Sequence, residues 1–541
     1  MKKTKLKEQL KWAFSLTRGY RSKLVLCLLL EVTTVVFSLS FVLLSKYAVD
    51  TAVKGGEHLS LILVGVVLSI ILGMVFRSLA QWINENVRIQ MVQQLQFNVA
   101  ELQMRSAWQV VKKWHSGDIQ VRVHSDCVEV VQMISVYSVS FFATLIRLLA
   151  SFGFLWYMDP MLAMIIVVIS PLFLFSKVYF RKMRRLNRRI KEEESNFGKV
   201  LQENMRFRVL IRAMNVFNRR LEAMDHTQKE LKGLRLEQLT FSTFSQLLMK
   251  ISVNIGYLVT FIWGVFRLQS GAISFGTMTA FLQLVGRIQS PIMSLAGYVP
   301  AFIRFRTACE RLIELEEQES EAIEDGLVIS DILALKAKGL SFRYEDFWVL
   351  DNINLQVERG RPVAVVGTSG KGKTTLIRLF LALINPNQGE IYIQTPVEKI
   401  LVGSEHRKNF AYVPQGNSLF NGTVKENLEV AIEGSDMELM DRALKIACAE
   451  FVYDLPDGLD TFIGESGYGL SEGQAQRIAI ARALMQDRPI WLFDEITSAL
   501  DEETSLKLME NLIYASKDKI SLFVTHDRNI AEMCNEIIYV N

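Results

Sequence analysis

The chain has 541 residues, enough for roughly three to four average domains. Half of the residues are hydrophobic (50%), 22% are charged and only 10 are proline, which excludes a disordered or low-complexity protein. The 61 Lys and Arg against 57 Asp and Glu give a net charge of +4, so a nucleic-acid partner is not expected. Five cysteines without a CxxC pair favour neither a disulfide framework nor a zinc site.

The amino-terminal part of the sequence, residues 1–325, contains six apolar segments. A bilayer core requires about 20 apolar helical residues. The segments come near that length, although the fourth is short and the sixth contains Arg287 and Pro291. We expect membrane spans near residues 22–46, 58–80, 133–157, 161–181, 245–267 and 275–303. Residues 330–541 contain no comparable segment, and we expect them to form a separate soluble domain.

Lysine and arginine residues gather at the amino terminus and after the fourth apolar segment. The opposite loops are short and nearly neutral, so the positive-inside rule predicts a multi-pass protein with both termini and the soluble domain in the cytoplasm. Apolar residues at helical spacing beside the first lysines predict an interfacial helix over about residues 5–18. The absence of a transit-like presequence favours a bacterial plasma (inner) membrane.

Two stretches predict helices much longer than one bilayer crossing. No glycine or proline separates Gly73 from Gly117, and residues 172–232 are interrupted only by Gly198. At 1.5 Å per residue, forty-odd residues span roughly 60 Å, about twice the hydrocarbon thickness. We expect these helices to continue into the cytoplasm, and separate soluble helices are the alternative.

A phosphate-binding loop is the clearest chemical motif. Residues 361–366 predict a buried strand, residues 376–383 predict a helix, and a G-x-x-x-x-G-K-T pattern lies between them. Backbone N–H groups of such a loop face the phosphates, Lys373 reaches the β- and γ-phosphates, and the Thr374 hydroxyl binds Mg²⁺. The predicted ATP-binding residues of this loop are Gly367, Thr368, Ser369, Gly370, Lys371, Gly372, Lys373, Thr374 and Thr375.

A second buried strand, residues 489–493, ends in two acidic residues. Asp494 fits the role of a Mg²⁺ ligand, and Glu495 that of a general base that orients the attacking water. His526 follows another apolar run, residues 520–524, from which it can reach a γ-phosphate. A lone histidine in that position is more often structural.

A second anion site is predicted where Leu470–Gln474 precedes a helical run, because a serine, a glycine and a helix N-terminus favour negative charge. One nucleotide does not need two phosphate sites within one chain. We therefore expect this second site to serve a nucleotide bound to another chain.

The order of these motifs resembles that of ATP-binding cassette (ABC) transporters, and the resemblance covers essentially the whole chain. It implies a membrane-spanning, all-α domain of six helices followed by an α/β P-loop NTPase domain, as in exporter-type half-transporters. It also implies that Tyr344 stacks on adenine and that Gln415 contacts the metal and assists catalysis together with Lys373. The other nucleotide-contacting residues that it implies are Ser471, Gly473, Gln474, Asp501 and His526.

By this resemblance, we expect ATP hydrolysis to drive the export or flipping of an amphipathic substrate (a lipid, drug or peptide) by an alternating-access dimer. The partner would be a second copy or a closely related half-transporter. Residues 115–121 and 205–214 would lie near the two coupling helices. Two alternatives stay open: an ATP-gated channel or regulatory membrane protein on the same scaffold, and a soluble cassette protein with a hydrophobic partner-binding half.

Four charged residues raise separate hypotheses. The signature has Glu472 where the family has glycine, and Lys371 is an unusual basic residue in the phosphate-binding loop. Across a symmetric dimer these two would pair, or Glu472 would face solvent. Arg147 and Arg287 fall deep within predicted spans, where charge is costly and often functional. They would favour an anionic or amphipathic cargo, or pair with carbonyl groups or acids between helices.

Overall fold

The computed structural model describes residues 5–111, 116–169, 176–318, 321, 326–345, 347–368, 371–430, 432, 434, 436–464 and 469–540. The chain forms two compact units. The helical unit comprises Met1–Ala100 and Gly117–Glu316, and the α/β unit comprises Glu101–Ser116 and Glu317–Asn541. The helical part therefore precedes the α/β part, as the sequence predicts, but the short segment Glu101–Ser116 groups with the α/β unit.

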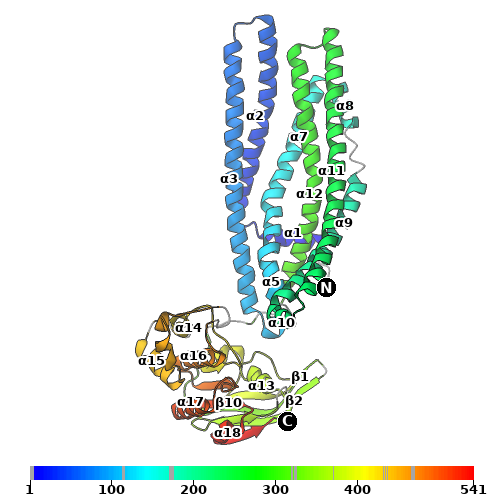
Figure 1. Cartoon of the computed structure of the whole chain (residues 1–541). Coiled ribbons are helices and arrows are strands. Elements are labelled where there is room, and N and C mark those ends of the chain that lie inside the picture. The colour runs from blue at the N-terminus through cyan, green and yellow to red at the C-terminus, as the bar shows by residue number, and fades with distance from the viewer. Residues whose placement is uncertain are drawn as a thin grey trace. The chain divides into compact units, whose positions relative to one another are not determined.

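The helical unit is a set of long helices that run beside one another (Figure 1). In chain order its helices are α1 (Leu6–Ser15), α2 (Arg21–Lys54), α3 (Leu59–Arg105), α5 (Ser116–Val121), the π-helical turn η1 (Arg122–Asp126), α6 (Cys127–Gln132), the π-helical turn η2 (Met133–Tyr137), α7 (Ser138–Met158), α8 (Pro160–Ile169), α9 (Ser176–Arg206), α10 (Arg208–Ala213), α11 (Phe217–Gln269) and α12 (Phe275–Glu316).

Among the described residues, four helices are long and apolar enough to cross a membrane: Arg21–Lys54, Leu59–Arg105, Asp118–Met158 and Phe217–Gln269. They coincide with the first, second, third and fifth predicted spans. The fourth predicted span falls partly on residues 170–175, which lie outside the described residues. The sixth lies in α12, which contains Pro291 and Pro300 and is not among these four helices. The count of six spans stays a prediction.

The predicted long helices are present, with one difference. Helix α3 is continuous over 47 residues and α11 over 53 residues, so each exceeds one bilayer crossing. The predicted interruption at Gly198 is wrong, because α9 passes through this glycine, and an exposed helical glycine costs only about 1 kcal/mol. The chain turns instead before α11, where Asn215 has a left-handed φ of 53°.

Helix α1 has the two faces expected of the predicted interfacial helix. Gln9 and Ala13 are buried, and Gln9 donates a hydrogen bond to Glu310 Oε1 of α12 at 2.9 Å. Leu10 and Phe14 are exposed on the helix, 46% and 62% respectively. One face therefore packs on the protein, and the apolar residues of the other face are available to lipid.

The α/β unit contains two main sheets and a set of helices. In chain order its elements are α4 (Trp108–Val111), β1 (Ala334–Tyr344), β2 (Phe347–Glu358), β3 (Val363–Val366), α13 (Lys373–Phe380), β4 (Gln388–Gln394), β5 (Lys399–Leu401), the 3₁₀ turn η4 (Ser404–Asn409), β6 (Phe410–Val413), β7 (Gly422–Thr423), α14 (Val424–Glu429), α15 (Met437–Ile446), the 3₁₀ turns η5 (Glu450–Asp454) and η6 (Gly458–Asp460), β8 (Phe462–Ile463), α16 (Glu472–Met485), β9 (Ile490–Asp494), α17 (Glu502–Ala515), β10 (Ile520–Thr525), α18 (Arg528–Glu532) and β11 (Glu536–Tyr539).

The five-stranded sheet has the order β11-β3-β10-β9-β6, and all of its pairings are parallel. Side chains alternate across it: Ile490 and Leu492 face a core shared with α13 and the antiparallel sheet β2-β1-β4-β5. Trp491 and Phe493 face a second core shared with α14–α17. Both faces are covered, and the carboxyl ends of β3, β6, β9 and β10 meet at one edge.

All five cysteines are free thiols, and four of them are buried; only Cys534 is partly accessible.

Candidate functional site

The carboxyl edge of the parallel sheet brings together residues that are far apart in the sequence. The phosphate-binding loop follows β3, Gln415 follows β6, Glu495 follows β9 and His526 follows β10. Adjacent parallel strands end at the same edge, so each of these side chains is delivered by the strand that precedes it.

The loop after β3 has the strand–loop–helix form that the sequence predicts. Gly372 has a φ of +88°, and a Cβ on it would lie 2.7 Å from Val349 Cγ1, so only glycine fits. Lys373 opens α13 and is 5% exposed. Its Nζ donates to the Gly367 carbonyl oxygen at 2.6 Å, so its ammonium group is held against the loop. Lys371 is exposed. Ser369 and Gly370 lie outside the described residues.

Glu495 lies at the centre of the convergence. Its Oε2 accepts a hydrogen bond from Gln415 Nε2 at 2.6 Å. Its Oε1 lies 3.4 Å from Lys373 Nζ and 3.8 Å from His526 Nδ1. The residue has a left-handed φ of 50°, a strained conformation of the kind found at functional sites. The other three residues predicted to be catalytic, Lys373, Gln415 and His526, therefore all contact the Glu495 carboxylate.

Asp494 is the last residue of β9 and is 1% exposed. Burial raises the pKa of its carboxyl group, against the smaller lowering effects of the Thr374 hydroxyl and the charge of Lys373. Neither carboxylate oxygen accepts a hydrogen bond of good geometry from the described residues. Two buried, unsatisfied carboxylate oxygens beside a threonine hydroxyl are oxygen donors of the kind that Mg²⁺ prefers.

The predicted second anion site lies at the N-terminus of α16. Ser471 caps this helix: its Oγ accepts from Gln474 N at 3.2 Å, and Gln474 Oε1 accepts from Ser471 N at 2.9 Å. Gly473 is buried, and a Cβ on it would lie 2.6 Å from the Ala499 carbonyl oxygen. Glu472 is exposed in the first turn, where the helix dipole favours negative charge.

Asp501 similarly caps α17, because its Oδ2 accepts from Thr504 N at 2.9 Å. This backbone hydrogen bond is the main reason that the pKa of Asp501 is lowered. No hydrogen bond or ion pair among the described residues joins Ser471, Gln474 or Asp501 to Lys373. In the part of the chain that the structure describes, no hydrogen bond or ion pair thus joins these two groups of predicted ATP-binding residues.

Tyr344, the predicted adenine-stacking residue, ends β1 and is half-buried. Its hydroxyl accepts from Arg378 Nη1 of α13 at 3.4 Å. The Arg378 guanidinium carbon also lies 4.7 Å from the centroid of the Trp108 ring, within cation–π range. The sequence analysis missed Arg378 and Trp108. The one available signal was that Arg378 lies on the helix predicted over residues 376–383, five positions after Lys373.

Arg147 and Arg287 line two cavities of the helical unit. The larger has a volume of about 550 Å³, and its lining includes Glu31, Arg77 and Arg147. Arg147 Nη2 lies 3.6 Å from Glu31 Oε2, so this arginine has an acidic partner from another helix. The smaller cavity, about 230 Å³, is lined by Arg77, Arg287 and Phe41, and the Arg287 guanidinium carbon lies 5.8 Å from the Phe41 ring centroid.

Two family descriptions match the sequence: "ABC transporter transmembrane region" over residues 24–292 and "ABC transporter" over residues 350–498. An uncharacterized ABC transporter ATP-binding protein of Bacillus subtilis, YwjA, is 30% identical over 413 residues, which is 74% of this chain and 70% of that protein. The fold matches a solved structure of a bacterial Atm1-family ABC exporter with ATP bound, with a TM-score of 0.82, 20% identity, and 96% and 94% of the two chains covered. The predicted fold class is confirmed.

Other relatives are longer than the part they share with this chain. An ATP-dependent lipid A-core flippase of Syntrophus aciditrophicus is 29% identical over 392 residues, 71% of this chain and 65% of that protein. A leukotoxin translocation ATP-binding protein of Mannheimia glucosida is 28% identical over 393 residues, 72% of this chain and 55% of that protein.

Proposed function

This chain belongs to the ABC transporter family, and from that premise we propose that it couples ATP hydrolysis to the export or flipping of an amphipathic substrate across a membrane. The observation that carries the proposal is the convergence of Lys373, Gln415 and His526 on the Glu495 carboxylate, directly after Asp494. A base, a lysine held at a phosphate-binding loop and a buried carboxylate are the groups that phosphoryl transfer to water requires.

Each of these residues has a proposed role. Glu495 orients the attacking water and accepts its proton, while Gln415 and His526 hold the carboxylate and the γ-phosphate in place. Lys373 holds the phosphates, and Tyr344 stacks on the adenine. Thr374, Gln415 and Asp494 would hold Mg²⁺, which when bound neutralises charge on the phosphate oxygens.

We propose that the active form is a dimer of two copies, or of this chain with a closely related half-transporter. Among the described residues, no hydrogen bond or ion pair joins the predicted ATP contacts of α16 and α17 to the Lys373 group, and we infer that a second chain supplies the other half of each site. The apolar window of α3 is only 6% buried, which leaves surface for lipid and for a partner. We place the dimer in a bacterial inner membrane, with the termini and the α/β unit cytoplasmic.

The cavities of the helical unit favour an anionic amphipathic cargo. Glu31 offsets the charge of Arg147, whereas no ion pair to Arg77 or Arg287 is found among the described residues. Two cationic side chains beside Phe41 suit a negatively charged head group with an apolar tail. The names of the flippase and of the leukotoxin protein agree with lipid or peptide export by relatives.

The test is ATP hydrolysis and cargo movement by the purified protein in lipid vesicles, with anionic lipids, neutral lipids, drugs and peptides compared. We expect anionic amphiphiles to stimulate hydrolysis and to move uphill, and Glu495→Gln to abolish both while it still binds ATP. Arg287→Ala should reduce the response to anionic cargo, because Arg287 is one of the two cations beside Phe41. Arg188→Ala, on an exposed surface, should not. ATP-dependent ion current without net cargo movement would instead indicate the channel alternative.

A further inference from the structure

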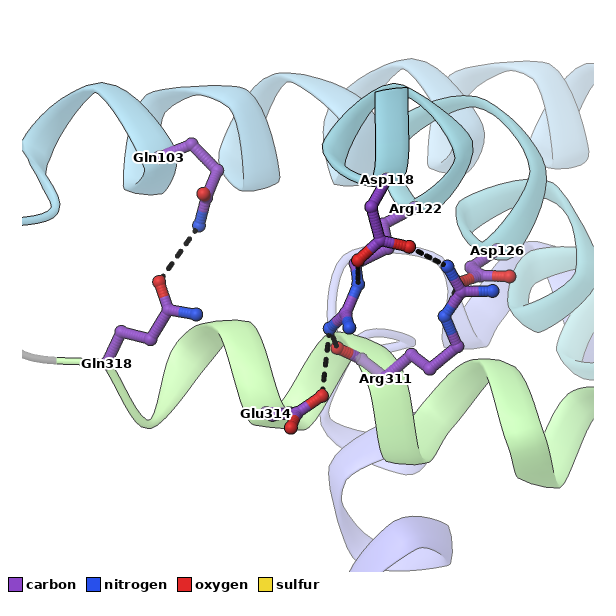
Figure 2. Close-up of polar contacts among 7 residues, drawn as sticks. All are labelled: Gln103, Asp118, Arg122, Asp126, Arg311, Glu314 and Gln318. Carbon is purple, nitrogen blue, oxygen red and sulfur yellow. Dashed lines mark hydrogen bonds and ion pairs between the residues drawn. The ribbon is translucent and has the colours of Figure 1, made fainter. Parts of the chain in front are cut away.

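Five charged residues of the helical unit form a connected network, here called the Arg122 network (Figure 2). Asp118, Arg122 and Asp126 come from α5 and η1, whereas Arg311 and Glu314 come from the last turns of α12. Arg311 Nη2 donates to Asp118 Oδ1 at 2.8 Å, and Arg311 Nε lies 3.2 Å from Asp126 Oδ2. Three carboxylates and two guanidinium groups therefore join two segments that are far apart in the sequence.

Arg122 is the most buried member, with 4% exposure. Its Nε donates to Asp118 Oδ2 at 3.2 Å, and its Nη1 donates to Glu314 Oε2 at 3.1 Å and to the Arg311 carbonyl oxygen at 2.6 Å. The forked guanidinium group carries donors on separate nitrogen atoms and so reaches acceptors on both segments at once, whereas the donors of a lysine share one nitrogen. Because one acceptor is a main-chain oxygen, Arg122 fixes the α12 backbone and not only its side chains.

The Arg122 network lies beside places where the chain passes between the two units. The chain passes between the two units after Ala100, after Ser116 and after Glu316. Asp118 lies just after the second of these passages, and Glu314 lies just before the third. The network therefore ties together, within the helical unit, two of the three places where the chain passes between the units.

Within the α/β unit, the third passage is joined to the first one, after Ala100. Gln103 Nε2 donates to Gln318 Oε1 at 3.4 Å, and Glu321 N donates to the Arg105 carbonyl oxygen at 2.8 Å (Figure 2 shows the first contact). The Glu321 carboxylate is in turn bound by Arg407, whose Nη2 donates at 3.1 Å. In each unit, then, the chain next to the passage after Glu316 is held by polar contacts to a second segment: the one after Ser116 in the helical unit and the one after Ala100 in the α/β unit.

We propose that Arg122 is a positioning residue for transport: it makes the two passages at Ser116 and Glu316 move as one, so that any displacement delivered along the chain reaches α7 and α12 together. This inference rests on the proposed transport function. The π-helical turn that carries Arg122 and Asp126 supports it, because such turns are rare and are often found at functional sites.

The test compares Arg122→Met, Arg122→Lys and a matched control, Arg304→Met, in vesicles of bacterial lipid. Arg304 of α12 binds Glu129 of the neighbouring helix α6, with Nε–Oε distances of 3.0 and 3.1 Å. Its side chain is 44% exposed, and it binds no main-chain oxygen in the described contacts. Two readouts are taken: cargo moved per ATP hydrolysed, and hydrogen–deuterium exchange of residues 116–126 and 311–318.

We expect Arg122→Met to lower the cargo moved per ATP by about tenfold while hydrolysis changes by less than about threefold. In Arg122→Met, hydrogen–deuterium exchange should rise in both segments together. Arg122→Lys should be intermediate in both readouts, and Arg304→Met should match the parent protein in both. If Arg122→Met does not accumulate, Glu314→Ala removes one acceptor and should shift both readouts in the same direction.

The proposal is overturned if only one segment loosens, if neither does, or if Arg304→Met loses as much coupling as Arg122→Met. A parent protein that hydrolyses ATP but moves no cargo refutes the proposed function instead. In that case the exchange readout alone still decides whether Arg122 joins the two segments.

Discussion

The tight packing of Gly473 gives a sharp prediction for Gly473→Ala. The added Cβ would lie 2.6 Å from the Ala499 carbonyl oxygen and 2.8 Å from Leu500 Cδ2. Ordinary contact begins at 3.4 Å, so the oxygen must retreat from 2.6 to 3.4 Å, about 0.8 Å. Because that oxygen belongs to the backbone just before Asp501, the shift displaces a predicted ATP contact. Overpacking of this kind costs about 1–3 kcal/mol.

The assay is ATP hydrolysis in lipid vesicles together with the temperature of half-inactivation. A displacement near 1 Å in a catalytic group can cost about a hundredfold in rate, so we expect Gly473→Ala to hydrolyse ATP about ten- to a hundredfold more slowly. Gly198→Ala is the matched control, because its Cβ meets nothing within 4 Å and alanine favours the helix by about 1 kcal/mol. It should keep its activity and its thermal stability.

Normal turnover and stability in Gly473→Ala would refute the argument, because the backbone at Ala499 would then yield at no cost. An equal loss in Gly198→Ala would also refute it, since the effect would not depend on the contact.

Three further predictions concern charges in the α/β unit. Because burial raises the pKa of Asp494, protons compete with Mg²⁺ for its carboxylate at a higher pH than they would at an exposed aspartate. Below that pKa, the affinity for Mg²⁺ should fall about tenfold per pH unit, and a metal titration of Asp494→Asn should show no such pH dependence. Lys371→Glu and Glu472→Lys should each lower ATP hydrolysis, and the double exchange should restore it; additive losses would exclude the pairing. Arg378→Met should weaken binding of a fluorescent ATP analogue about three- to tenfold, because Tyr344 loses the hydrogen bond from Arg378, and unchanged affinity would contradict this.

The sequence predicts the centre of the candidate site well because its geometry is local. A strand, a glycine loop and a helix are consecutive, so the position of Lys373 at the start of the helix follows from the sequence alone. A buried strand that ends in Asp494 and Glu495 must place both acids at the same edge of the sheet. The contact of Glu495 with Lys373 then follows from the parallel order of β3, β10 and β9.

Contacts that depend on tertiary packing could not be predicted in this way. Trp108 reaches Arg378 because the segment Glu101–Ser116 packs within the α/β unit, which no local pattern indicates. The partner of Arg147 was open between carbonyl groups and acids, and only the helix packing identifies Glu31. The predicted interruption at Gly198 was wrong because it rested on the weak helical propensity of glycine, whereas the neighbouring turns keep the α9 helix continuous.

The burial of the cysteines has a practical consequence. Four thiols are enclosed by the protein, and burial raises the pKa of Cys534, the partly accessible one, to about 12, so almost none of it is thiolate at neutral pH. Maleimide dyes react with thiolates, and the native protein should therefore stay nearly unlabelled. A single cysteine introduced at an exposed position would carry a fluorophore by itself, so that conformational cycling can be followed one molecule at a time in an otherwise unaltered chain.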